Sequence, residues 1–350
     1  KETHITTDLF GKGENDGLIA IASGGIYMDQ KSAANDLIVR SVSSGGDIYL
    51  GSDKSILMGT VTGTDVVNYI RAENNGSITL EARGGSIGEA ETDEKLSEED
   101  KRKSNKGVRI LNSGTENKSD VTLRAKDNVY VTGIASADGK TPTTAGKAGS
   151  LDLTVGSVNK DETLKNVGIS VDGTLNLTGD LKSSETASIY TTTDLTVGQS
   201  ISSKDTYVGS AGNMTLSGNI LEGTENLTLE AAQSIEQTKG SAIAKNTKAK
   251  AGKDINLAST INKLQNVTVD AQKGSATIVS ANDADGDLNV TTVGNVANDL
   301  TITNLKNGKA NKIHFNKDLK AGGTISITNE EADIEVANGT TMEATNISLK

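Results

Sequence analysis

The chain has 350 residues, a formal net charge of −11, no cysteine, no tryptophan and one proline, and aromatic residues make up 2% of it. The lack of cysteine excludes a disulfide scaffold, a thiol nucleophile and a thiolate metal site, and the negative charge argues against binding nucleic acid by general attraction. So few aromatic rings would fill a globular core of ordinary width poorly, whereas a thin core of stacked Val, Ile and Leu rows needs no large rings.

A short phrase recurs along the chain: a small polar residue or Gly, then an apolar, a polar and an apolar residue. Such alternation between turn-forming residues is typical of a short strand with one buried face. Copies occur at 76–80, 119–123, 149–153, 173–177, 225–229 and 253–257. From Leu175 to Ile347 the first apolar residues of successive strand phrases lie mostly about 12 or about 20 residues apart. This spacing predicts an array of coils of roughly 20 to 25 residues, each with room for three short strands. We therefore predict an all-β fold, a parallel β-helix, over one continuous segment, residues 1–350; a β-sandwich is the alternative.

The first part of the chain carries strand phrases at 17–22, 36–42, 47–50 and 77–82. Gly-Gly pairs at 24–25, 45–46, 84–85 and 322–323 lack the strand-to-helix context of a phosphate-binding loop, so we interpret them as turns. No run of 18 or more apolar residues occurs, and we expect no helix that spans a membrane. The chain begins at Lys1 without a signal peptide and ends inside a strand phrase at 347–350, so we expect it to be part of a larger protein.

Residues 89–107 interrupt the pattern with acidic residues first and basic residues last. This order complements a helix dipole, and Ser97 is placed to cap a short exposed helix that follows it. We expect an extruded insertion, which is either a solvated loop without a partner or a partner-contact loop. Its candidate contact residues are Glu91, Glu94, Glu98, Lys101, Arg102 and Lys103. A second Gly/Thr/Lys-rich stretch, 137–149, reads as a surface loop around Pro142.

The alternation within each copy of the phrase predicts which side chains point into the core and which point to solvent. At 174–178 we place Leu175 and Leu177 inside and Asn176 outside. Asn-X-Ser/Thr triplets fall mostly inside the phrase itself, so strand chemistry explains them without glycosylation. A lysine cluster would either contact anionic glycans or only keep the surface soluble; its members are Lys239, Lys245, Lys248, Lys250 and Lys253.

Few residues in the sequence suggest a catalytic or metal-binding site. Asp283, Asp285 and Asp287 alternate around a Gly, which fits either a tight turn or a weak calcium site, although calcium needs more oxygens than these three residues supply. His4 and His314 are the two histidines, and the strand alternation around His314 predicts a lone, exposed side chain. We predict no catalytic residue and no cofactor. Some parallel β-helices are enzymes that process polysaccharides, but the carboxylates here are scattered and a sugar would find few rings to stack on.

Several motifs carry a family resemblance: Gly-Gly-Ser-Ile-Gly at 84–88 before the acidic stretch, the Asn-Leu-Thr-Leu and Asp-Ile-Asn-Leu strands, and Gly-Asn-Met-Thr-Leu-Ser-Gly at 212–218. With these motifs, most of residues 17–350 resembles the filamentous-haemagglutinin-type exoproteins, which are adhesins of Gram-negative bacteria secreted by the two-partner or autotransporter routes. The resemblance implies a right-handed parallel β-helix, export through an outer-membrane secretion barrel, a secreted or bacterial cell-surface location, and adhesion through a host-cell or bacterial receptor, protein or glycan. It transfers no binding residue. The alternatives are a passive stalk of a toxin or cytolysin exoprotein and a β-helical polysaccharide-processing enzyme.

Overall fold

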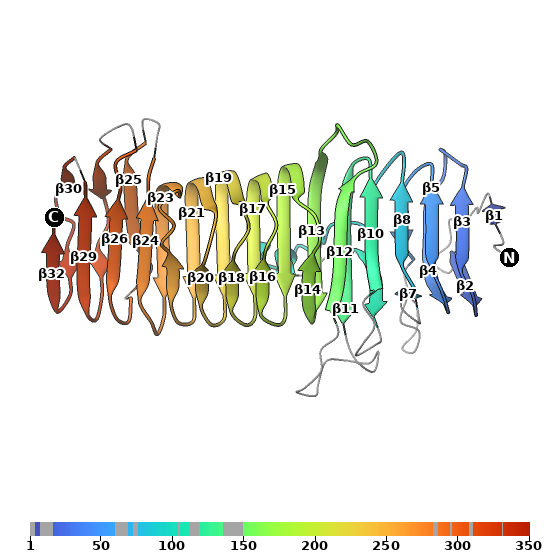
Figure 1. Cartoon of the computed structure of the whole chain (residues 1–350), viewed down its shortest axis with the longest axis horizontal. Helices are drawn as coiled ribbons and strands as arrows, with labels where there is room; N and C mark the ends of the chain where they lie inside the picture. The colour runs from blue at the N-terminus through green and yellow to red at the C-terminus, as the bar shows by residue number, and fades with distance from the viewer. Residues whose placement is uncertain are drawn as a thin grey trace. The chain divides into compact units, whose positions relative to one another are not determined.

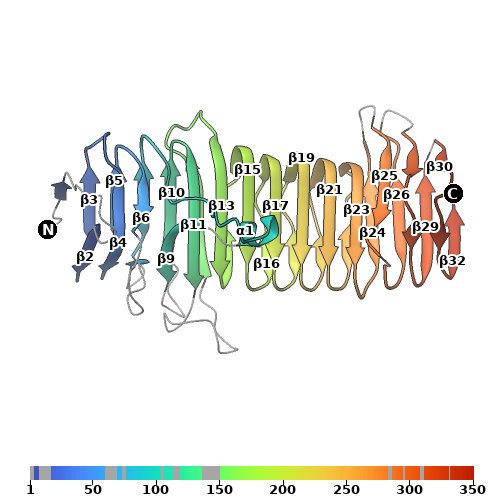
Figure 2. The same cartoon turned by 180° about the vertical axis from the view of Figure 1, so that it is seen from behind.

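The computed structural model describes residues 4–7, 17–59, 69–72, 76–103, 106–112, 119–135, 150–282, 286–294, 296–307, 311–330 and 332–350. The chain divides into two compact units, residues 1–193 and 194–350. In each unit parallel strands stack coil upon coil, which confirms the predicted parallel β-helix (Figures 1 and 2). The continuity of the array from one unit to the other stays a prediction, and the loop predicted at 137–149 lies outside the described residues.

Two sheets organise the described part of unit 1. The first, the β3 sheet, has the strand order β1 (His4–Thr7), β3 (Ile26–Gln30), β5 (Ile48–Ser52), β8 (Ile78–Ala82), β10 (Ser119–Ala125), β12 (Ser150–Ser157) and β14 (Thr174–Leu177). The second, the β4 sheet, has the order β2 (Leu18–Ala22), β4 (Leu37–Ser44), β7 (Tyr69–Ala72), β9 (Val108–Asn112), β11 (Asn128–Ala135), β13 (Leu164–Asp172) and β15 (Leu181–Thr191), with β6 (Ile56–Met58) beside β4. A single short helix, α1 (Glu98–Lys103), separates β8 from β9 along the described chain.

Unit 2 repeats this arrangement. Its β19 sheet has the order β17 (Ile201–Ser210), β19 (Ile220–Ala231), β21 (Ser241–Ala251), β23 (Lys263–Ala271), β25 (Leu288–Thr292), β27 (Ile313–Phe315) and β30 (Ile334–Val336). Its β20 sheet has the order β16 (Leu195–Val197), β18 (Met214–Leu216), β20 (Ile235–Gln237), β22 (Ile255–Leu257), β24 (Ala276–Ser280), β26 (Leu300–Asn304), β29 (Thr324–Asn329) and β32 (Asn346–Leu349). The short strands β28 (Leu319–Lys320) and β31 (Met342–Glu343) pair with each other.

The core consists of apolar ladders, because each strand pairs in register with the equivalent strand of the next coil. One ladder in the β3 sheet contains Met28, Leu50, Leu80, Leu123 and Val155, which are paired one coil after another. None of these side chains is more than 8% exposed. Thin rows of aliphatic side chains therefore fill the interior, as the shortage of aromatic residues predicts.

The strand β14 tests the predicted facing. Leu175 is buried and Asn176 is exposed, as expected, but Leu177 is only half-buried where we predicted burial. Leu177 is the last residue of the last strand in its sheet, so no further strand of that sheet covers it. The outward Asn176 is also held in place, because its amide donates a hydrogen bond of 2.7 Å to a carboxylate oxygen of Asp152 on β12.

The Gly-Gly pairs lie at bends between strands, as predicted. Gly45 shows why glycine is needed there. A Cβ at this position would lie 2.2 Å from the backbone oxygen of Ser23 in the preceding coil. Turns of successive coils stack at strand spacing, so a side chain on that side would collide with the neighbouring backbone.

Unit 2 departs from the predicted division into three short strands. In its first coils, one strand of 9 to 12 residues, such as β19 or β21, replaces two of them. Each of these strands breaks its inward and outward alternation at one place. For β17 and β19 the register to the next coil also shifts there, between Ser203 and Asp205 and between Gly223 and Asn226. On β21 the bulge places Lys245 and Asn246 outward in succession, between buried Ala244 and buried Thr247. An extra outward residue bends a strand, so the bulges turn one strand around a corner of the coil.

Candidate functional site

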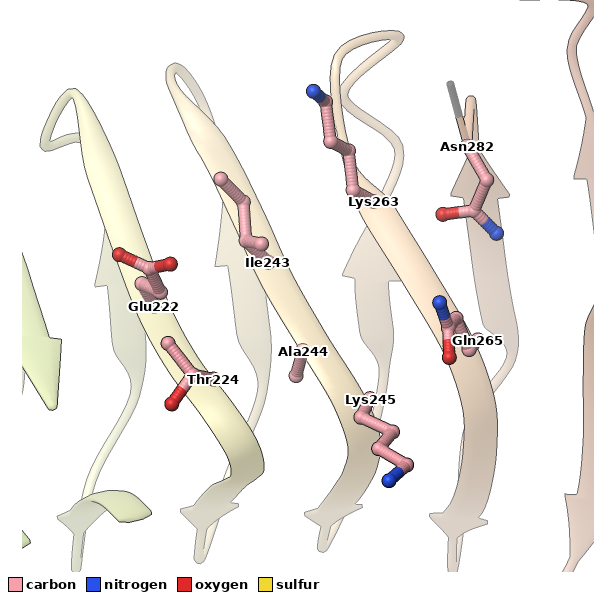
Figure 3. Close-up of a pocket in the computed structure, with 8 residues that line it drawn as sticks. All are labelled: Glu222, Thr224, Ile243, Ala244, Lys245, Lys263, Gln265 and Asn282. Carbon is pink, nitrogen blue, oxygen red and sulfur yellow. The ribbon is translucent and has the colours of Figure 1, made fainter. Parts of the chain in front are cut away.

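A groove of about 310 Å³ follows the bulges of three successive coils in unit 2 (Figure 3). Its lining comes from β19, β21 and β23 and from the residues after β24: Glu222, Thr224, Ile243, Ala244, Lys245, Lys263, Gln265 and Asn282. The volume is at the lower end of the range typical of ligand sites. The groove lies where the long strands bend, so the fold itself produces the hollow.

The register between the coils sets the two walls of the groove. One wall is the column Glu222, Ile243 and Lys263, which pair in sequence across β19, β21 and β23. The other wall consists of residues at the bulges, namely Thr224, Lys245 and Gln265. Each coil therefore contributes one residue to each wall (Figure 3).

The floor and the far end of the groove are built from small or buried residues. Ala244 is 4% exposed and forms part of the floor at the centre of the groove. Asn282 closes one end, and its amide donates hydrogen bonds to the backbone oxygens of Leu264 (2.8 Å) and Gly286 (3.0 Å). These bonds fix the end wall, since both amide hydrogens are engaged.

The charged groups of the lining differ in how firmly they are held. The Glu222 carboxylate accepts a hydrogen bond of 2.9 Å from the Ser202 hydroxyl on β17. The Lys245 ammonium lies 3.5 Å from the Glu225 carboxylate, and both side chains are about half exposed, so this pair contributes little to stability and can open for a ligand. Within the described part of the chain, the side chains of Thr224 and Gln265 make no hydrogen bond.

This set of groups suits binding better than glycoside hydrolysis. Glycoside hydrolysis ordinarily uses two carboxyl groups, one on each side of the bond to be cut, and Glu222 is the one carboxylate among the described residues that line the groove. That the chain is not an enzyme stays a prediction. What the groove does offer is hydroxyl, amide and ammonium groups around a small apolar floor, which can bind a polar ligand.

An amide ladder runs beside the groove on the outer side of the β19 sheet. Asn246 donates to Asn226 at 3.2 Å, Asn266 donates to Asn246 at 3.2 Å, and Asn289 donates to Asn266 at 3.1 Å. Asp205 caps one end by accepting from Asn226, and Asn316 continues the other end at 3.3 Å. The spacing of 20 residues between 226, 246 and 266 was a signal in the sequence that could have identified this ladder.

The structure distributes the predicted lysine cluster over several places. Lys245 lines the groove, and Lys250 forms an ion pair of 3.0 Å with Glu230 of the preceding coil. Lys248 is exposed on β21, and Lys239 and Lys253 are exposed in turns. Only Lys245 of this cluster lies at the groove; Lys263, which also lines it, was not singled out by the sequence.

The insertion contains the predicted helix. Ser97 caps α1, since its hydroxyl accepts the Asp100 backbone N–H at 3.1 Å. A backbone bridge between Glu89 and Lys106 closes the base of the insertion. The helix does not stand free, as an extruded insertion would: it lies against β13 and β15 (Figure 2). There the Ser170 hydroxyl donates to the backbone oxygen of Lys103 at 2.7 Å.

The six candidate contact residues of the insertion have different environments. The Glu91 carboxylate accepts the backbone N–H groups of Asp93 and Thr92 and lies 3.4 Å from the Lys106 ammonium; the bond from Asp93 is the main reason that its pKa is lowered. The Lys103 ammonium lies 5.9 Å from the centre of the Tyr190 ring on β15. Glu94 is exposed and Lys101 is partly exposed, while the side chains of Glu98 and Arg102 lie outside the described residues. The contact role of these six residues stays a prediction.

Asp287 belongs both to the predicted calcium site and to the surroundings of His314. Asp283 and Asp285 lie outside the described residues, where no structural statement is made. The two oxygens of Asp287 are engaged, one with the Lys312 backbone N–H (2.7 Å) and the other with the His314 Nε2 (2.8 Å). Burial opposes the effect, but these contacts lower the pKa of Asp287. Among the described residues, no group of three or more His, Asp and Glu side chains is placed to hold a metal ion.

His314 is not the lone exposed side chain that we predicted. Its side chain is 24% exposed, and its Nδ1 lies 3.0 Å from a carboxylate oxygen of Glu335. Asp287 and Glu335 belong to the coils before and after it, so the imidazole bridges three coils. Strand alternation predicted the outward direction correctly, but it carries no information about the neighbouring coils.

Comparison with known proteins gives no match to a protein family, a curated protein or a solved structure. In the described ranges, no helix is both long and apolar enough to cross a membrane.

Proposed function

We propose that this chain is a segment of a secreted or cell-surface bacterial adhesin, which attaches to host cells or other bacteria through its β-helical surface. The observation that carries the proposal is the groove of unit 2, a hollow with polar walls that extends over three coils beside an exposed amide ladder. The resemblance to exported adhesins adds support and suggests a surface receptor and an outer-membrane secretion barrel as partners.

The mechanism is preorganised binding, without a chemical step or a cofactor. The outward amides of Asn226, Asn246 and Asn266 are tied to those of the next coil, so beside the groove a partner meets groups that are already ordered. Ordering these groups in advance reduces the entropy lost on binding. The fold therefore supplies affinity through rigidity, and the outward residues supply selectivity.

In unit 1, ion pairs rather than amide hydrogen bonds connect outward side chains of successive coils. The Arg83 guanidinium bonds to Asp29 on β3, to Asp53 at 2.8 Å and to Glu81 at 3.2 Å, and so joins three successive coils. Burial alone would lower the pKa of Arg83, but the hydrogen bonds to the three carboxylates raise it, and the group stays charged. Such a bracing cluster also favours the second candidate, a passive stalk that spaces another part of its protein.

Binding of the whole chain to cells distinguishes the two candidates. Fluorescently labelled chain is added to cultured epithelial cells and to Gram-negative bacteria, and binding is measured by flow cytometry with excess unlabelled chain as competitor. An adhesin segment gives saturable binding that the unlabelled chain displaces. A chain that binds no cell type in the panel contradicts the proposal and favours the stalk.

A further inference from the structure

We propose that the groove along β19, β21 and β23 binds an uncharged oligosaccharide, a short chain of neutral sugar units, through side-chain hydrogen bonds to the sugar hydroxyls. The inference rests on the proposed adhesive function and specifies the ligand class of the same site.

The charged groups of the lining disfavour a charged ligand. Figure 3 shows the ammonium groups of Lys245 and Lys263 pointing away from each other and from the lining between them. The Lys245 ammonium lies 3.5 Å from the Glu225 carboxylate, and Lys263 has a partner of its own. An anion would therefore meet the Glu222 carboxylate without a cation turned toward it. A cation would enter a lining that carries more positive than negative charge, so an uncharged ligand suits the groove best.

Two uncharged polar side chains of the lining are free to bind a ligand. Within the described ranges, neither the Thr224 hydroxyl nor the Gln265 amide makes a hydrogen bond. The Gln265 amide lies on the side of β23 that faces β21 (Figure 3). Each of these groups both donates and accepts hydrogen bonds, and a sugar hydroxyl does the same. The Glu222 carboxylate, oriented by the Ser202 hydroxyl, adds an acceptor that makes a strong, charge-assisted hydrogen bond with a hydroxyl.

The positions of these groups set the length of the ligand. Thr224 belongs to β19 and Gln265 to β23, two coils further along the sheet. Successive coils are about 4.8 Å apart, so the backbones at these two residues lie about 10 Å apart. On the coil between them, Ala244 forms the floor and Ile243 offers an aliphatic surface to the C–H groups of a sugar ring. A single sugar reaches only one of the two polar groups, whereas a chain of two or three units reaches both.

The groove is a poor site for a peptide. β19, β21 and β23 each pair with another strand on both sides, so the groove has no open edge that an added peptide strand could join. Among the described lining residues, Ile243 is the one large aliphatic side chain, which is too little for the apolar anchors of a bound helix. Recognition therefore depends on side-chain hydroxyl, amide and carboxylate groups, which suit a sugar.

Isothermal titration calorimetry of the whole chain with trimers of glucose, galactose and N-acetylglucosamine tests the inference. We expect at least one neutral trimer to bind, with the same affinity at low and high salt, because an uncharged ligand forms no ion pair that salt would screen. The corresponding monosaccharide should bind at least about fivefold more weakly, since it loses hydrogen bonds that each contribute a factor of about 2 to 10. No binding of any neutral trimer, or tighter binding of a galacturonic acid trimer, would overturn the assignment.

The variant Thr224→Val/Gln265→Leu removes both free hydrogen-bonding groups and nearly keeps their size. It should weaken the binding of the trimer at least about fivefold. The matched control, Thr215→Val/Gln272→Leu, makes the same changes at two residues of unit 2 that do not line the groove, and it should bind as the unchanged chain does. Both variants should keep the melting temperature. Full affinity in the groove variant, or equal loss in the two variants, contradicts a saccharide site in the groove.

Calorimetry and the cell-binding assay together separate this inference from the proposed function. If the chain binds a neutral trimer through the groove but binds no cell, the saccharide assignment stands and the adhesive function is wrong. If the chain binds cells but none of the trimers, the adhesive function stands and the saccharide assignment is wrong.

Discussion

Replacing Leu80 by Ala tests whether the ladders of the core stabilise the β-helix. Leu80 is fully buried, and its ladder neighbours Leu50 and Leu123, one coil before and one coil after it, are buried as completely. The surrounding strands are fixed by parallel pairing, so the cavity cannot collapse. Leu→Ala at sites of this kind costs about 2 to 5 kcal/mol, and we expect about 3 to 4 kcal/mol here.

Two controls lie in the same unit. Thr79→Ala changes the adjacent outward residue and should cost under about 0.5 kcal/mol. Leu177→Ala changes a half-buried leucine at the end of the same sheet, and it should cost about 1 to 2 kcal/mol because less apolar surface is lost. Urea unfolding followed by circular dichroism gives the three values. If Leu80→Ala costs no more than Thr79→Ala, the inward and outward assignment is refuted.

Three further predictions follow from individual contacts. Gly223→Ala should destabilise unit 2 by more than about 1 kcal/mol, because the new Cβ would lie 2.0 Å from a backbone oxygen. In the control Gly198→Ala the new Cβ meets only one atom, at 3.9 Å, so the melting temperature should be almost unchanged. Asn176→Asp replaces the amide that donates to Asp152 with a second carboxylate, so it should lower the melting temperature at pH 7 and have little effect near pH 4. An unchanged melting temperature at pH 7 would contradict the hydrogen bond between Asn176 and Asp152. Burial alone would raise the pKa of Asp29, but hydrogen bonds from Lys31 and Arg83 outweigh it and lower this pKa below the ordinary value of 3.8. The stability that Asp29 contributes is therefore present above pH 3.8 and is lost as the pH falls through the lowered pKa of the folded state. Arg83→Gln should flatten this part of an acid-unfolding curve.

The contacts of α1 change what we expect from the insertion. Its sequence, with few apolar residues, predicts that replacing residues 89–106 by a short Gly-Ser linker leaves stability nearly unchanged. The bond between Ser170 and the Lys103 backbone and the position of Lys103 over Tyr190 indicate a small loss instead. One hydrogen bond contributes about 1 kcal/mol and a surface cation–π contact about 0.5 to 1 kcal/mol.

The sequence alone was sufficient for the features that depend on neighbouring residues. Alternation of apolar and polar residues predicted the parallel β-helix and the inward direction of residues such as Leu175. Ser97 followed by acidic and then basic residues predicted α1, because a helix cap and a dipole act within one or two turns. Fold class and facing are local properties in an array, since every coil repeats the same short phrase.

The tertiary structure decided everything that depends on register between coils. Asp287 and His314 are 27 residues apart, and Asn226 and Asn246 are 20 residues apart; their contacts depend on the length of the intervening coil and on where it bulges. The groove lies where β19, β21 and β23 each place residues outward in succession, and the pairing between coils sets Glu222, Ile243 and Lys263 side by side. A shift of one residue in any coil would send these side chains to the other face, so the binding surface is determined by the stacked coils together.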